Sequence, residues 1–142
     1  RMKSVIADSS GLISLLFPKD SNNSRAIKIS KSIIEASHRL ILPGEIFTET
    51  INVIGRKQGH YKAFQVGLGF VRSKLYEMAD TTSKIRDAAF KKFNEQSESV
   101  SFTDCIVMAF ADEFDTKEIF GFDDAFRKNG YIRIGVDKKS KN

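Results

Sequence analysis

Short apolar segments alternate with amphipathic helical patterns along the whole chain, and this alternation restricts the possible folds more than any other feature. The pattern predicts strands over residues 3–8, 39–42, 75–79, 118–122 and 131–136. Helical segments separate consecutive strands. Strands that are joined by helical crossovers form a parallel sheet, and the helices cover its faces. The sequence therefore predicts an α/β/α sandwich around a central parallel sheet of about five strands.

The helical segments carry their own start signals. Pro43 opens one helix, at a position where its missing N–H costs nothing. Ser101 and Asp104 have the spacing of a capping box ahead of the most apolar helix of the chain. The apolar periodicity predicts helices over residues 12–17, 20–37, 43–57, 61–74, 85–93 and 102–114. In the 61–74 helix, Phe64, Leu68 and Val71 share one face.

Length and composition are those of one globular unit. The chain has 142 residues, of which 41% are hydrophobic and 29% are charged. A domain of this size buries roughly 70% of the surface that its unfolded chain exposes. There is no internal repeat, linker or low-complexity segment, so we expect a single domain over residues 1–142. Residues 137–142 are polar and Lys-rich, which predicts a mobile tail.

The charge balance and the cysteine content narrow the functional classes. A net charge of +5 favours a polyanionic partner such as nucleic acid, although on charge alone a slightly basic soluble surface is the better explanation. The single cysteine, Cys105, allows no intramolecular disulfide and no Cys-based zinc site, which suits a reducing compartment. No segment approaches the ~18 consecutive apolar residues of a membrane span. We therefore expect a cytoplasmic protein without membrane attachment.

Four acidic residues stand at structural boundaries of this basic chain. Asp8 and Asp123 follow predicted strands, at the end of a parallel sheet where ligands bind. Glu49 and Asp104 border the apolar faces of helices. Each has an ordinary explanation, because Asp is a favoured helix cap and a Glu within a helix usually faces solvent. Their joint placement is more informative, and we expect all four to meet at one site.

Carboxylate oxygens without a His or Cys cluster favour a hard cation, Mg²⁺ or Mn²⁺. Such an ion lowers the pKa of a bound water and stabilises charge on a phosphate group. Asp8, Asp104 and Asp123 are the strongest candidates for metal ligands. Glu49 is expected either to bind the metal or to orient the attacking water. This chemistry indicates a metal-dependent nuclease.

An acidic centre repels nucleic acid, so basic residues are needed to hold the phosphate backbone. The candidates are basic residues in the predicted helices or at their ends, namely Arg25, Lys28, Arg56, Lys57 and Arg127. For any one of these clusters, an ordinary solvated surface is the better explanation.

Four segments occur in a characteristic order. Val-Ile-Ala-Asp-Ser-Ser at 5–10 is followed by Glu-Thr-Ile-Asn-Val-Ile at 49–54. Ser-Phe-Thr-Asp-Cys-Ile-Val-Met-Ala-Phe-Ala at 101–111 and Ile-Phe-Gly-Phe-Asp-Asp-Ala-Phe at 119–126 come next. In this order and at this length, the segments resemble the PIN-domain ribonucleases, especially the small single-domain toxins of the VapC type. The resemblance extends from residue 5 to about residue 134.

The resemblance implies an endoribonuclease that uses Mg²⁺ or Mn²⁺. It maps the acidic quartet of the family onto Asp8, Glu49, Asp104 and Asp123, and it implies products with a 5′-phosphate and a 3′-hydroxyl. It also implies an antitoxin protein that covers the acidic cleft. A homodimer is implied as well, for which residues 20–37 and 43–57 are the expected interface.

Two positions depart from the family pattern. Gly121 stands where the family often has Thr or Ser before Phe-Asp, so a hydroxyl near the metal ligands is missing. Ser9 and Thr103 are the candidates to supply it. Asp124 stands where a basic or polar residue is common, and it is a further candidate for a place next to the ligands.

Three alternatives stay open at this point. One is a catalytically inactive PIN-like domain that binds RNA or serves as a scaffold. Another is a nuclease of ribosomal or other RNA processing that is not a toxin. The third is a receiver-like signalling domain, which is disfavoured because no strand-end Asp is followed later by a strand-end Lys.

Overall fold

The computed structural model describes residues 3–138 and contains one parallel sheet of five strands. The strands are β1 (Ser4–Ala7), β2 (Arg39–Pro43), β3 (Tyr76–Ala79), β4 (Glu118–Phe120) and β5 (Ile132–Arg133). Their order across the sheet is β3-β2-β1-β4-β5, so β1 lies in the centre between β2 and β4. The predicted parallel α/β sheet is confirmed. The tail that was predicted over 137–142 lies outside the described residues from position 139 onward.

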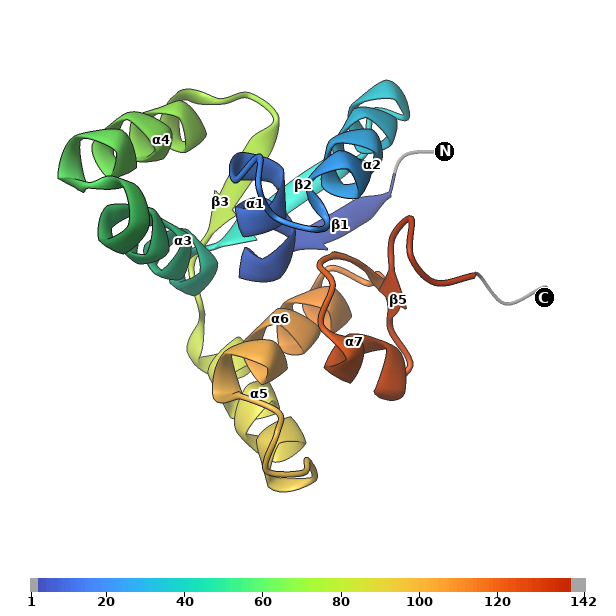
Figure 1. The fold of residues 1–142 in the computed structure, drawn as a ribbon. Coiled ribbons are helices and arrows are strands. Elements are labelled where there is room, and N and C mark those ends of the chain that lie inside the picture. Colours follow the sequence, from blue (N-terminus) through green and yellow to red (C-terminus); the bar gives the residue numbers. More distant parts are fainter. Residues whose placement is uncertain (1–2, 139–142) are drawn as a thin grey trace.

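The helices form two layers on opposite faces of the sheet. They are α1 (Ser9–Leu16), α2 (Asn23–Glu35), α3 (Gly44–Gln58), α4 (His60–Arg72), α5 (Ser83–Asn94), α6 (Phe102–Glu113) and α7 (Asp124–Lys128). Figure 1 shows α1 to α4 gathered on one side of the strands and α5 to α7 on the other. This division follows from right-handed crossovers that first run outward from β1 and later return across it.

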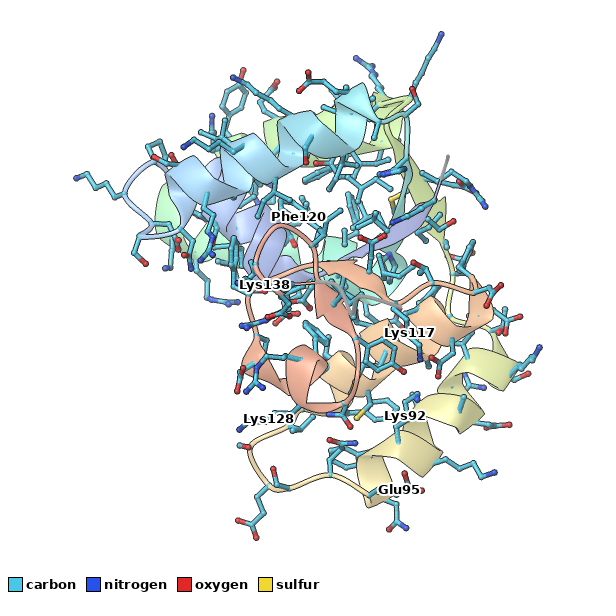
Figure 2. The ribbon with its side chains drawn as sticks, turned by 90° about the vertical axis from the view of Figure 1, so that its right-hand side faces the viewer. Lys92, Glu95, Lys117, Phe120, Lys128 and Lys138 are labelled. Carbon is cyan, nitrogen blue, oxygen red and sulfur yellow. The ribbon has the colours of Figure 1, made fainter. Side chains whose placement is uncertain are left out.

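Helix α6 lies against the central strand and forms the middle of the core. Residues 104–111 of this helix are all buried, as expected for a helix that is apolar on every side. Phe110, Phe120 and Phe126 are the largest fully buried side chains. Figure 2 shows Phe120 between the two helical layers. Cys105 is also fully buried, so it belongs to the core.

Two helices begin at residues other than those predicted. Helix α1 starts at Ser9 rather than at residue 12, because the Asp8 side chain accepts the Ser10 N–H and caps a helix that begins directly after β1. Helix α2 starts at Asn23 rather than at Asp20. The Asp20 carboxylate accepts the Asn22 N–H at 2.8 Å, and this turn precedes the helix.

The buried face of α4 differs from the predicted one. Phe64 and Val71 are 59% and 62% exposed, whereas the buried residues of this helix are Ala63, Gly67 and Phe70. The Phe70 ring packs edge-on against Tyr76, with 4.9 Å between ring centroids. This packing with β3 selects a stripe next to the one that sequence periodicity favoured.

Strand β5 is shorter than predicted, with two residues in place of 131–136. The Arg133 N–H donates to the Asp137 carboxylate at 2.9 Å, and the Val136 N–H donates to the Arg133 carbonyl at 2.9 Å. These bonds turn the chain away from the sheet. The Arg133 side chain also donates to the Phe122 carbonyl at 3.0 Å, so β5 supports the loop that follows β4.

The start of β5 is also fixed by the helical layer beneath it. The Tyr131 hydroxyl donates to Asp112 on α6 at 2.8 Å. Lys92 of α5 and Lys117, both labelled in Figure 2, place their Nζ atoms 5.6 and 5.1 Å from the centre of the Tyr131 ring.

No helix among residues 3–138 is both long and apolar enough to span a membrane.

Candidate active site

A cavity of about 540 Å³ opens at the carboxyl ends of β1 and β4, beside the first turns of α1 and α6. Five acids line it, namely the four predicted acids Asp8, Glu49, Asp104 and Asp123 together with Asp20. The hydroxyl-bearing residues around them include Ser9, Ser10, Ser101 and Thr103. We call this hollow the acidic cavity. Parallel strand order brings Asp8 and Asp123 to one edge, and the helices that lead away from this edge supply Glu49 and Asp104.

Asp8 lies at the bottom of the acidic cavity and is 3% exposed. Its backbone N–H donates to the Phe120 carbonyl at 3.0 Å, which continues the pairing of β1 with β4. Its Oδ2 atom accepts the Ser10 N–H at 3.2 Å and the Ser10 hydroxyl at 2.6 Å. The pKa of Asp8 is raised to about 7, mainly by burial; the hydrogen bonds from Ser10 oppose the rise, and the charges of Asp104 and Glu49 add to it.

Asp104 occupies the first turn of α6 and is 8% exposed. The predicted capping box is present: the Asp104 N–H donates to the Ser101 hydroxyl at 3.1 Å, and the Ser101 N–H donates to the Asp104 carboxylate at 3.2 Å. Burial and then the neighbouring charge of Asp123 raise the pKa of Asp104 to about 6. The Asp104 side chain therefore both caps α6 and lines the acidic cavity.

Glu49 and Asp123 are exposed at the rim of the same cavity. Asp123 caps α7 by accepting the Ala125 N–H at 2.9 Å. The charge of Glu49 acts on Asp8, and the charge of Asp123 acts on Asp104. Since Asp104 also acts on Asp8, electrostatic interactions connect all four acids in a chain.

The two adjacent acids after β4, Asp123 and Asp124, have different surroundings. Asp124 binds Arg127 through two hydrogen bonds of 2.7 and 3.0 Å and lies 3.7 Å from Arg133. These ion pairs lower the pKa of Asp124, the Arg127 hydrogen bond being the main cause. Asp123 lines the acidic cavity and Asp124 does not. Of the other residues expected next to the ligands, Ser9 and Thr103 both line it.

A second cavity, of about 640 Å³, adjoins the first along α3. Glu49 and Thr103 line both cavities and so form their common wall. Arg56, which was expected to contact RNA backbone, lines the second cavity together with Thr48 and Asn52. The two hollows thus form one groove along α3, in which Arg56 lies with two further acids, Glu45 and Asp80.

The other basic candidates lie away from this groove. Lys57 places its Nζ 5.5 Å from the centre of the Phe17 ring, and Arg127 is held by Asp124. Arg25 and Lys28 are exposed on α2, and neither lines the acidic cavity.

Two contributors were not identified from the sequence. Ser10 bonds directly to Asp8, and Arg133 holds the Phe122 carbonyl next to Asp123. Ser10 had a local signal, because a hydroxyl two residues after an Asp commonly bonds to it in an Asx or Ser/Thr turn. Arg133 had none, since it lies 11 residues from its carbonyl partner in the chain.

The donor chemistry of the acidic cavity is entirely oxygen, which suits Mg²⁺ or Mn²⁺. Within residues 3–138, no three His, Cys, Asp or Glu side chains stand close enough together to hold a metal ion by themselves. Mg²⁺ sites commonly use one or two carboxylates and keep several waters on the ion. The arrangement therefore fits an ion whose coordination is completed by water rather than a closed protein cage.

Comparison with known proteins identifies the family. The family model described as PIN domain matches residues 5–130. Among solved structures, VapC20 of Mycobacterium tuberculosis, described as a sarcin-ricin loop cleaving toxin, superposes with a TM-score of 0.80 at 18% sequence identity. The similarity covers 92% of this chain and 98% of that one, and shows a shared fold. None of the curated proteins matches the sequence. By the extent of the family match, this chain belongs to the PIN domain family.

Proposed function

We propose that the protein is a Mg²⁺- or Mn²⁺-dependent endoribonuclease and the toxin of a toxin–antitoxin pair. The observation that carries this proposal is the convergence of Asp8, Glu49, Asp104 and Asp123 on one cavity. Membership of the PIN family and the fold shared with VapC20, a sarcin-ricin loop cleaving toxin, support the same conclusion. The single buried thiol, Cys105, is compatible with action in the cytoplasm, where RNA substrates are found.

The electrostatics of the cavity favour a cation. Asp8 and Asp104 have pKa values raised to about 7 and about 6, so their ionised forms are poorly accommodated when no cation is bound. A divalent ion would offset this cost. We assign Asp8, Asp104 and Asp123 as its ligands, directly or through water. The bound ion would supply a water of lowered pKa and neutralise charge on the phosphate.

The protein side chains then have distinct roles. In hydrolysis, a bond forms between a water oxygen and phosphorus, and the bond from phosphorus to the 3′ oxygen breaks. Glu49 is exposed on the wall between the two cavities, where substrate and water reach it. We assign it to accept the proton of the attacking water, while the 3′ oxygen takes a proton from solvent. The products carry a 5′-phosphate and a 3′-hydroxyl.

The groove along α3 is the proposed path of the RNA. Among the described residues that line the second cavity, Arg56 is the only basic one, and it would pair with a phosphate. Thr48 and Asn52 offer hydrogen bonds for ribose or base. The net charge of +5 adds long-range attraction for the polyanion.

A cleavage assay tests the proposal directly. Purified protein is incubated with structured and single-stranded RNA in the presence of Mg²⁺, Mn²⁺ or EDTA, and the ends of the products are mapped. We expect cleavage with either ion, none with EDTA, and none by Asp8→Asn. Asp87→Asn is the matched control, because Asp87 is exposed on α5 and does not line the cavity.

If the wild-type protein cleaves no RNA with either ion, the nuclease proposal fails. Retained RNA binding in that case would favour the inactive binding-module alternative.

We also propose an antitoxin partner and a homodimer. Exposed apolar side chains support protein contacts on both helical layers, with Ile27 and Ile34 on α2, Tyr61 and Phe64 on α4, and Phe90 on α5. The two α2 residues lie within the expected 20–37 interface. Size-exclusion chromatography with light scattering tests the dimer, and a clean monomer at high concentration contradicts it. A short neighbouring gene for a DNA-binding protein would support the antitoxin.

A further inference from the structure

Gly121 lies against Asp8 and Ser10, which line the acidic cavity, at a point where no side chain fits without movement. A Cβ atom at this position would lie 2.9 Å from the Asp8 Cβ, 3.1 Å from the Ser10 hydroxyl oxygen and 3.2 Å from the Asp8 Oδ2. The first of these distances is below normal van der Waals contact. The backbone of residue 121 therefore approaches Asp8 as closely as it does because residue 121 is a glycine.

The Ser10 hydroxyl occupies the space beside Gly121. It donates to the Asp8 Oδ2 at 2.6 Å and accepts the Phe122 N–H at 2.9 Å. Because a backbone N–H can only donate, the Ser10 proton is directed to the carboxylate. One oxygen atom thus joins the end of β1 to a loop that lies 112 residues later in the chain.

This connection relates two proposed metal ligands that come from different strands. Asp8 follows β1, and Asp123 comes directly after the Phe122 N–H that Ser10 accepts. Helix α1 also approaches β4 closely, since a Cβ at Gly11 would lie 2.3 Å from the Phe120 carbonyl oxygen. The separation of the two acids is therefore set through α1, and Ser10 is the side chain that makes the link.

We propose that Ser10 is a positioning residue of the active site. Its hydroxyl lies beside Gly121, orients the Asp8 carboxylate, and holds it at a fixed distance from Asp123. The inference rests on the proposed metal-dependent nuclease function. It implies that a side chain at position 121 would press on both Asp8 and the Ser10 hydroxyl.

Four variants test this inference: Ser10→Ala, Ser10→Thr, Gly121→Ala, and the double variant Ser10→Ala with Gly121→Ser. For each, cleavage is measured as kcat and KM for RNA across a Mn²⁺ titration, and the melting temperature is measured with and without Mn²⁺. Ser73→Ala is the matched control, because the Ser73 hydroxyl also accepts a backbone N–H, that of Leu75 at 3.0 Å, on an exposed turn.

We expect Ser10→Ala to lower kcat, or to raise the Mn²⁺ concentration for half-maximal activity, by about 10-fold to 100-fold. The KM for RNA stays unchanged, since Ser10 does not hold the substrate. Ser10→Thr keeps the hydroxyl and restores activity. Gly121→Ala impairs the Mn²⁺ response while Ser10 is present. The double variant is no better than Ser10→Ala alone, because a side chain at position 121 still meets the Asp8 Cβ.

Several results would overturn the proposal. Wild-type kcat and Mn²⁺ response in Ser10→Ala would show that the hydroxyl positions nothing. Recovery of the wild-type Mn²⁺ response in the double variant would contradict the assignment of this role to position 10. If Ser10→Ala does not fold, Ser10→Thr becomes the deciding variant. Loss of the Mn²⁺ response in Ser10→Thr would then overturn the proposal.

The melting temperatures separate this inference from the nuclease proposal. If the wild-type protein cleaves no RNA but is stabilised by Mn²⁺, a smaller Mn²⁺ effect in Ser10→Ala supports the positioning role, and an equal effect overturns it. If Mn²⁺ neither activates nor stabilises the wild-type protein, both proposals are wrong.

Discussion

The four acids of the site form two pairs with different surroundings. Asp8 and Asp104 are buried, each is bonded to a helix start, and each has a raised pKa. Glu49 and Asp123 are exposed at the rim. The buried pair is fixed by the fold, and its ionisation is costly. The exposed pair is solvated and open to substrate. The comparison indicates that the buried pair creates the need for a cation and that the rim pair completes its surroundings.

The largest expected effect comes from neutralising the buried pair. Asp8→Asn and Asp104→Asn should each reduce metal-dependent RNA cleavage by at least about 100-fold, because each removes a fixed ligand charge. The fold should persist, since an Asn side chain still accepts the capping hydrogen bond. Circular dichroism and product formation are the measurements.

The corresponding rim changes, Glu49→Gln and Asp123→Asn, should cost less, about 10-fold each. A larger loss from either rim change than from both buried changes would reverse the proposed division of roles.

The next effect concerns stability in the absence of metal. The folded-state pKa of Asp8 is raised from 3.8 to about 7, so its contribution to stability is greatest below pH 4 and is lost as the pH rises through 7. Asp8→Asn removes this loss and should raise the free energy of unfolding at pH 8 by up to about 4 kcal/mol. Urea unfolding at pH 5 and pH 8 measures the difference, with Asp123→Asn as the exposed comparison. Equal stability changes at the two pH values would contradict the assignment.

Metal binding should change the free energy of unfolding by a smaller amount and with the opposite dependence on pH. Mn²⁺ at about 100 times its dissociation constant stabilises a folded protein by about 2.7 kcal/mol. We expect this stabilisation in the wild-type protein at pH 8. It should weaken as the pH falls through 7 and 6, because protonated Asp8 and Asp104 bind cations poorly. Thermal unfolding across this pH range measures it, and stabilisation that persists at pH 5 would argue against these two ligands.

The smallest effect tests the groove beyond the rim. Arg56→Ala should weaken RNA binding modestly and reduce the slope of log affinity against log salt by about 0.7, the value for one phosphate contact on a single strand. Binding is measured by fluorescence anisotropy in the non-cleaving Asp8→Asn background. Arg86→Ala, an exposed change on α5, serves as the control. Identical slopes for both variants would exclude Arg56 from the RNA path.

The sequence allowed much of the fold to be predicted, because its dominant signals are local. Strand and helix alternation determined the sheet, and the capping pattern of Ser101 and Asp104 is present as expected. The buried stripe of α4 could not be predicted, since it depends on the packing of Phe70 against Tyr76 on β3. Helix periodicity alone does not distinguish neighbouring stripes of similar hydrophobicity.

The candidate site shows the same limit. Asp8 and Asp123 could be placed together because parallel strands end at a common edge. The link through Ser10 could not be predicted, because Phe122, whose N–H the Ser10 hydroxyl accepts, lies 112 residues later in the chain. The nearby Gly121 gives no sign in the sequence that Ser10 packs beside it. The sequence also suggested Asp124 for a place next to the ligands, whereas the structure pairs it with Arg127 outside the cavity lining.

The hydrogen bond from Arg133 to the Phe122 carbonyl has a practical consequence for anyone who shortens this protein. The PIN domain match stops at residue 130, yet the guanidinium that secures the Asp123 loop comes three positions later. A fragment that ends at residue 130 would retain all four acids of the candidate site. It would lose Arg133, whose side chain holds the loop that carries Asp123.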